Sequence, residues 1–194
     1  MSDNQPIDTL PQYLTGQLLI AMPTMLDPRF QRTIIYVCTH NSEGAMGLVI
    51  NRLFEAIHFN DLLNQLDIQP CSRSDDIRVH YGGPMESSRG FVLHTPDFVH
   101  ESTMLMHDEV LLTVSVDVLK AMADGRGPKY SLLALGYAGW GPGQLDSELQ
   151  TSSWLSMRAD PALVFDPNIE TKWERLIATI GVNLASFSAE CGHA

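Results

Sequence analysis

The glycine-rich segment between Gly136 and Gly143 is the part of this sequence best suited to ligand chemistry. Glycines allow positive φ and let backbone N–H groups approach an anion, and a helix is predicted directly afterwards, at residues 144–149. The start of a helix favours negative charge. The spacing is neither GxGxxG nor that of a P-loop, which ends in Lys and Ser or Thr. Two interpretations stay open: a tight strand-to-helix turn with Trp140 packed over it, or an anion or nucleotide pocket.

A second candidate segment runs from Pro23 to Asp27, after the first predicted strand. Asp27 before Pro28 is typical of a turn or a helix N-cap, and Arg32 is close enough in sequence to pair with it. The segment could be a purely structural turn or part of a ligand site. A ligand site gains support if this segment and the glycine segment meet in space. The candidate ligand-binding residues are Pro23, Thr24, Asp27, Arg32, His40, Gly139, Trp140, Gly141 and Gly143.

Other reactive side chains form no known catalytic or metal-binding pattern. His94, His100 and His107 lie among acidic residues, but they lack HExxH or HxH spacing. The serines lack a GxSxG elbow, and the three cysteines lack CxxC spacing. His40 and His80, each at a strand end, could in principle act as a general base. We therefore name no catalytic residue, metal or cofactor, and favour a non-enzymatic protein over an enzyme.

Composition and charge narrow the classes of partner. The 194 residues are 44% hydrophobic and 18% charged, which is typical of a packed globular protein and excludes a disordered chain. The net charge of −11 disfavours direct contact with nucleic acid and with anionic membranes. The first ten residues lack the features of a signal peptide, no apolar run is long enough to span a membrane, and three cysteines suggest reduced thiols. These features predict a cytoplasmic protein.

The pattern of apolar residues predicts hairpins of strands with helices inserted between them. Residues 33–39 and 45–51 flank turn residues and should form a hairpin. Asn60 is the expected N-cap of the first helix, and Asp166 with Pro167 should begin the last. Strands are expected at the segments 17–22, 33–39, 45–51, 78–81, 90–95, 109–114, 130–137, 154–157 and 162–165. The expected helices are 61–66, 115–124, 144–149 and 168–180, and residues 98–107 are expected to form a loop.

This order of elements predicts an α+β fold. The strands and helices do not alternate, which favours a mainly antiparallel sheet, and the number of strands favours one that curls towards a barrel. Residues 1–13 are polar, contain two prolines and should form a flexible arm. We expect a single domain over residues 14–194.

Several ordered motifs resemble the AlgH/YqgE family of bacterial cytoplasmic proteins. The resemblance covers nearly the whole domain, from about Leu14 to Gly181, and the spacing of the motifs makes it specific. The motifs are AMPTMLDP at 21–28, GAMGLVINR at 44–52, GGP at 82–84, GFVLH at 90–94 and GYAGWGPGQL at 136–145.

The resemblance implies a bifurcated sheet rolled into a pseudo-barrel, around which the four expected helices would pack. It also implies a link to transcriptional regulation, and it assigns no catalytic residue. Because the chain is acidic and lacks a helix-turn-helix signature, an indirect regulatory route through a protein or small-molecule partner suits it best. The alternatives are a ligand-binding protein or enzyme that uses the glycine segment, and a direct DNA-binding regulator. The oligomeric state stays open.

Overall fold

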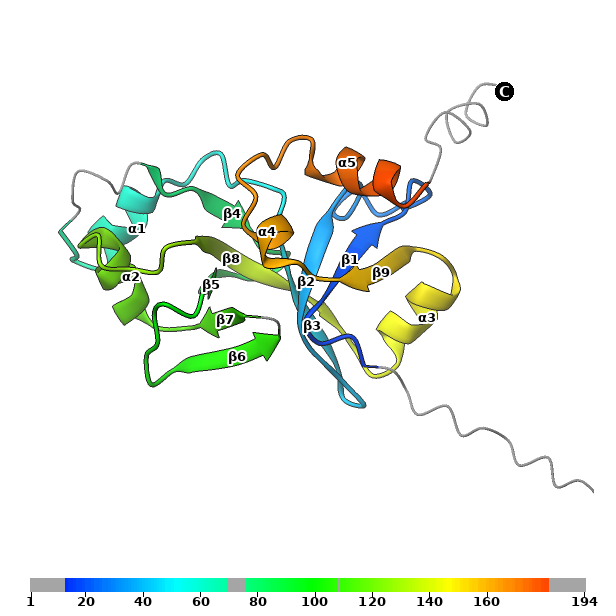
Figure 1. Ribbon diagram of the computed structural model, residues 1–194, viewed down its shortest axis with the longest axis horizontal. Coiled ribbons are helices and arrows are strands. Elements are labelled where there is room, and N and C mark those ends of the chain that lie inside the picture. The colour runs from blue at the N-terminus through cyan, green and yellow to red at the C-terminus, as the bar shows by residue number, and fades with distance from the viewer. Residues whose placement is uncertain (1–12, 70–75, 108, 182–194) are drawn as a thin grey trace, which may run out of the picture.

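The computed structural model describes residues 13–69, 76–107 and 109–181. In these residues, nine strands form one curled, mainly antiparallel sheet and five helices pack against it (Figure 1). The predicted α+β class with a curled sheet is therefore confirmed. The flexible arm predicted for residues 1–13 lies outside the described residues, apart from Tyr13.

The elements follow the chain in hairpins, as the sequence pattern predicts. The strands are β1 (Gln17–Ala21), β2 (Ile34–Asn41), β3 (Gly44–Val49), β4 (Val79–Tyr81), β5 (Met85–His94), β6 (Thr103–His107), β7 (Val110–Thr113), β8 (Ser131–Trp140) and β9 (Trp154–Arg158). The helices are α1 (Phe59–Gln65), α2 (Val116–Ala123), α3 (Gln144–Gln150), α4 (Pro161–Val164) and α5 (Lys172–Thr179). The predicted hairpin of β2 and β3 is present.

Strand β8 joins the two halves of the sheet. Its first half pairs with β5 on one side and with β4, in parallel, on the other, whereas its last residues pair with β3. The strand order is β6-β7-β5-β8-β3-β2-β1-β9, and Figure 1 shows β8 running from one half into the other. Because one strand serves both halves, the sheet divides and curls instead of staying flat.

Two glycines make the division of the sheet possible. A Cβ on Gly83 would lie 2.1 Å from the carbonyl carbon of Tyr137, and a Cβ on Gly136 would lie 2.4 Å from the Gly83 oxygen. Gly136 also has a φ of 72°, in the left-handed region that favours glycine. The GGP motif is therefore explained by a close crossing of two backbones.

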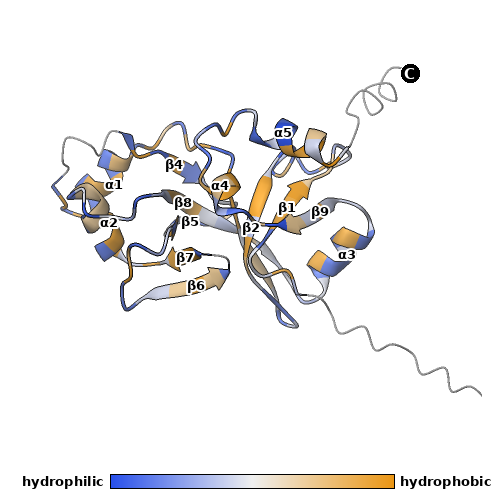
Figure 2. Ribbon diagram, viewed as in Figure 1, coloured by the Kyte–Doolittle hydropathy of each residue, from blue (hydrophilic) through white to orange (hydrophobic). Residues whose placement is uncertain are grey.

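The apolar residues form three clusters. The first joins the sheet to α4 and α5, the second joins it to α3, and the third joins it to α1 and α2; Figure 2 colours the hydrophobic residues of these elements orange. Representative members are Leu18, Tyr36 and Trp173 in the first, Trp140, Leu145 and Trp154 in the second, and Phe59, Val118 and Leu133 in the third. Among the residues placed here, no helix is long and apolar enough to cross a membrane.

Three predictions about helices need correction. Residues 162–165 belong to α4 and its C-cap, not to a strand, because Asp160 accepts a 2.8 Å hydrogen bond from the Ala162 amide and Pro161 opens the first turn. The last helix begins at Lys172, not at residue 168. Helix α1 begins after His58, whose amide donates to Asp61 Oδ2 at 2.9 Å, so Asn60 is not its N-cap.

Two predictions about strands also need correction. Part of the predicted loop at residues 98–107 is the edge strand β6, which pairs with β7. In addition, the predicted glycine turn between Gly136 and Gly143 is mostly strand, since β8 continues through Trp140. Glycine is unfavourable inside a strand, but Gly136 is required by the close crossing of the two backbones described above. The turn itself is confined to Gly141–Gly143.

Candidate functional site

The two candidate segments meet across a cleft of about 540 Å³. One wall is the loop between β1 and β2, and the other is α3 with the adjoining ends of β8 and β9. Three aromatic residues line the cleft, namely Phe30, Trp140 and Trp154, and the Phe30 and Trp154 rings meet edge to face at 5.8 Å. The glycine segment and the loop after β1 therefore share one cavity.

The predicted ligand-binding residues divide into two groups. Thr24, Asp27, Gly139 and Trp140 line the cleft. Pro23, Arg32, His40, Gly141 and Gly143 are not among its lining residues. As ligand contacts, all nine stay predictions.

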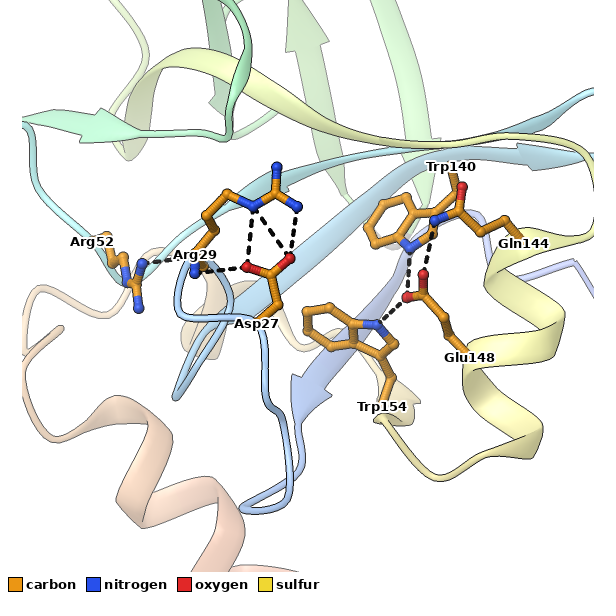
Figure 3. Close-up of polar contacts among 7 residues, drawn as sticks. All are labelled: Asp27, Arg29, Arg52, Trp140, Gln144, Glu148 and Trp154. Carbon is orange, nitrogen blue, oxygen red and sulfur yellow. Dashed lines mark hydrogen bonds and ion pairs between the residues drawn. The ribbon is translucent and has the colours of Figure 1, made fainter.

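The β1–β2 loop is held by side chains that follow β3. Arg52 donates from Nη1 to the Arg29 oxygen and from Nη2 to the Gln31 oxygen, both at 2.7 Å. Asn51 Oδ1 accepts from the Ile34 amide at 2.7 Å. Arg52 holds Arg29 by its backbone oxygen, so the Arg29 side chain is left to pair with Asp27 at the edge of the cleft (Figure 3).

Asp27 and Arg29 form a bidentate ion pair on the loop wall. Arg29 Nε lies 3.0 Å from Asp27 Oδ1, and Nη2 lies 2.7 Å from Oδ2. The guanidinium beside it lowers the pKa of the Asp27 carboxyl. The predicted pairing of Arg32 with Asp27 is wrong, since Arg32 instead bonds Glu174 and lies over the Trp173 ring at 5.0 Å.

Glu148 organises the opposite wall, as Figure 3 shows. Its Oε2 accepts from the indole N–H groups of Trp140 at 2.9 Å and Trp154 at 2.7 Å, and its Oε1 accepts from Gln144 Nε2 at 2.9 Å. One carboxylate thus joins β8, α3 and β9. Sequence reasoning missed Glu148, although its spacing of four residues from Gln144 places both on one helical face.

The remaining glycine turn is closed internally. The Gly141 amide donates to Gln144 Oε1 at 3.0 Å, and Gly143 takes a φ of 69° at the N-cap of α3. Gly139 allows Met85 to lie against β8, because a Cβ there would be 2.6 Å from the Met85 sulfur. The glycines therefore shape the cleft wall, and the Gly141 N–H already has a partner.

His40 lies away from the cleft and is buried. Its Nδ1 accepts from the Leu14 amide at 3.2 Å, its Nε2 lies 3.6 Å from Asp146 Oδ2, and its ring meets Tyr13 at 5.3 Å. These contacts fix the segment that enters β1.

The other reactive groups noted in the sequence are dispersed. His94 Nε2 bonds Thr113 Oγ1 at 2.8 Å, and His100 lies 3.5 Å from Asp117. Within the three described stretches, no group of three His, Cys, Asp or Glu side chains is placed to hold a metal ion. Cys38 is free, and burial raises the pKa of its thiol to about 12.

The cleft offers surfaces for contact more than groups for catalysis. Its indoles and Phe30 provide an apolar surface, and Arg29 is a cation whose side chain is 60% exposed. Asp27 is engaged by Arg29, and Glu148 by three donors. A general base needs a lone pair that can reach the substrate, and here both carboxylates are used in holding the walls.

Comparisons with known proteins agree with this architecture. A family model described as AlgH-like matches residues 18–185. A UPF0301 protein of Rhodospirillum rubrum is 50% identical over 182 residues, covering 94% of this chain and 95% of the relative. A UPF0301 protein of Nitrobacter hamburgensis is 51% identical, covering 94% and 88%.

Two solved structures share the fold. The solution structure of the AlgH protein from Pseudomonas aeruginosa has a TM-score of 0.77 and 45% identity, covering 96% of this chain and 98% of that one. The crystal structure of a Corynebacterium diphtheriae protein has a TM-score of 0.69 at 20% identity, covering 92% and 90%. The second likeness concerns the fold alone.

Proposed function

The chain belongs to the AlgH-like family, and from that premise we propose that it is a non-enzymatic regulatory protein that binds a small organic ligand in its cleft. The cleft lies between the β1–β2 loop and α3. The observation that carries the proposal is the set of internal bonds in that cleft. Both carboxylates are held by neighbouring side chains, while the cavity is lined by three aromatic rings and by Arg29, which is itself paired with Asp27.

The cleft favours a ligand with an apolar ring and a polar group. Its volume of about 540 Å³ lies within the range of roughly 300–1,000 Å³ that is typical of small-molecule sites. Phe30 and Trp154 supply edges and faces for a ring, and Arg29 and Thr24 supply polar contacts on the loop wall.

A regulatory role would follow if a protein partner contacts the β1–β2 loop and the bound ligand changes the conformation of that loop. Leu26, on this loop, is 89% exposed, and it lines the same cleft. Ligand binding beside this exposed apolar residue would change the surface that a protein partner contacts, and so the affinity for that partner. The net charge of −11 disfavours direct DNA binding, and a cytoplasmic setting agrees with the free Cys38.

A thermal-shift screen of nucleotides, phosphorylated metabolites and common cofactors tests the proposal. A ligand that binds only the folded state raises the unfolding midpoint by mass action. The matched variants are R29A and R126A, because Arg126 pairs with Asp124 two residues away on the surface, as Arg29 pairs with Asp27. We expect a saturable shift that R29A weakens and R126A leaves unchanged.

Two results would count against the proposal. One is a flat screen with well-folded protein. The other is a ligand whose shift is equal in R29A and R126A, which would place binding outside the cleft. Turnover of a compound, abolished by one substitution in the cleft, would overturn the non-enzymatic part.

A further inference from the structure

A second, smaller cavity of about 240 Å³ lies away from the cleft. It is bounded by β4, the start of β8 and the connection between α4 and α5, three segments that lie close together in Figure 1. His80, Ser131 and Val164 are among the lining residues. Its volume is below the range typical of drug-sized ligands, so any occupant must be small.

His80 is a buried polar side chain that borders this cavity. It is 5% exposed, and neither ring nitrogen has a hydrogen-bond partner of normal geometry among the described residues. Burial lowers the pKa of its ring to about 4, and the charges of Arg78 and Lys172 lower it further, while backbone groups of Leu133 and Arg78 act in the opposite direction. The ring is therefore neutral at pH 7, with one donor and one acceptor.

Lys172 is a buried cation near the same cavity: it is not among the lining residues, but it donates to the backbone of Val164, which is. It is 1% exposed, and its Nζ donates to the Val164 oxygen at 3.2 Å, which leaves two of its three hydrogens without a hydrogen bond in the described part of the chain. Asp166 acts on it through space, but the Asp166 carboxylate is bonded to Arg175. A buried ammonium without a bonded carboxylate is costly, and an anion would offset that cost.

The charge around the cavity contrasts with the charge of the whole molecule. Arg78, Lys129 and Lys172 lie at or beside it, against the carboxylates of Asp76 and Asp166. Asp166 is the carboxylate already paired with Arg175. A protein of net charge −11 thus concentrates cations at a small polar cavity, where they would attract an anion.

We propose that this cavity is a second ligand site that holds a small phosphate-type oxyanion. Lys172 and His80 are its buried donors, and Arg78 completes it at the exposed side. Charge-assisted hydrogen bonds from an ammonium to an oxyanion are among the strongest in proteins. The oxyanion would use the free hydrogens of Lys172 and bond the His80 ring.

The test is a titration with inorganic phosphate at constant ionic strength, with NaCl as the balancing salt. Two readouts are followed: the thermal midpoint, and the ¹⁵N signals of the His80 ring, assigned with H80Q. We expect a saturable rise in midpoint and a His80 shift with the same apparent affinity. K172M should weaken phosphate binding about tenfold or more, and the surface control K120M should leave it unchanged.

The His80 signal keeps the test decisive if K172M fails to fold, because it is measured on the unaltered protein. R78Q, at an exposed position, then replaces K172M and should also weaken phosphate binding. A His80 ring that does not respond to phosphate beyond the NaCl control would overturn the proposal. So would equal phosphate shifts in K172M and K120M.

Discussion

At the scale of single residues, the cleft depends on the carboxylate of Glu148. It accepts hydrogen bonds from two indoles and one amide, which come from β8, β9 and α3. Removing an acceptor from such a group leaves buried donors unpaired, and that costs more than the bond itself contributes. The wall of the cleft should therefore be sensitive to the loss of one oxygen.

The variant E148Q tests this dependence. Its amide NH₂ would face donors, so we expect a loss of about 1–3 kcal/mol in the free energy of unfolding. Urea unfolding followed by tryptophan fluorescence gives the value. E170Q, at an exposed position of the same chemical type, should stay within about 0.5 kcal/mol of wild type. Equal midpoints for the two variants would show that Glu148 does not hold the wall.

Lys172 makes the stability of the protein depend on pH. Burial lowers the pKa of its ammonium from 10.5 to about 8. Between these values the unfolded state binds more protons than the folded state, so stability rises with pH across that window. Below pH 8 both states are charged, and the folded state bears the full cost of the buried cation.

The variant K172M should therefore be more stable than wild type at pH 7. We expect a gain on the order of 1–3 kcal/mol, which shrinks as the pH rises from about 8 to 10.5. Chemical unfolding in phosphate-free buffer across that pH range measures the difference in unfolding free energy between K172M and wild type. Contributions from the titratable groups that both proteins share cancel in this difference. A gain that is constant with pH, or a loss at pH 7, would contradict the assignment of a buried, unpaired ammonium.

The sequence could predict which segments form the cleft, but not which side chains meet in it. The sequence marks Asp27 as a turn residue, yet its partner is Arg29, two residues away, and not Arg32. Spacing alone allows either pairing. The choice is made by Arg52, which fixes the loop from the segment that follows β3, and by Glu174, which engages Arg32.

At the scale of elements, the crossing of Gly83 over β8 determines how the sheet divides. A Cβ at this position would lie within 2.3 Å of three backbone atoms of Tyr137 and Ala138. Backbone in a paired strand cannot move aside as a flexible side chain can. Only glycine therefore fits at position 83 without a shift of the backbone.

We expect G83A to lose about 3 kcal/mol or more of stability, through overpacking and strain. G90A is its control in the same part of the chain, because the nearest atom to a Cβ at Gly90 is 3.9 Å away. That variant should stay within about 1 kcal/mol of wild type. Thermal or urea unfolding compares the two. A G83A protein as stable as G90A would contradict the close approach.

The elements themselves were largely predictable, and the errors have local causes. The capped start at Asp160 and Pro161 makes α4 a helix, although its apolar residues favour a strand. Strand β6 was missed because its exposed Met104 and Leu105 do not alternate as a half-buried strand does. Its pairing with β7 is a tertiary contact, which local propensity cannot show.

At the scale of the whole molecule, the curled sheet places distant segments at two cavities. The cleft joins residues near 27 with residues near 148, and the smaller cavity joins β4, β8 and the α4–α5 connection. The α+β class followed from the order of elements. The cavities did not, because they depend on long-range packing that a single sequence leaves open. Of these two cavities, the larger one, the cleft, is the proposed site of the small organic ligand.

The most direct test of that claim is an NMR spectrum of the three tryptophan indole N–H groups during a ligand screen. Trp140 and Trp154 line the cleft, whereas Trp173 donates to the Ala21 oxygen at 2.8 Å and is not among the cleft's lining residues. Trp173 is thus an internal control. We predict ligands that shift the Trp140 and Trp154 signals saturably and leave Trp173 unchanged. Ligands that bind but move none of the three, or Trp173 alone, would contradict the claim.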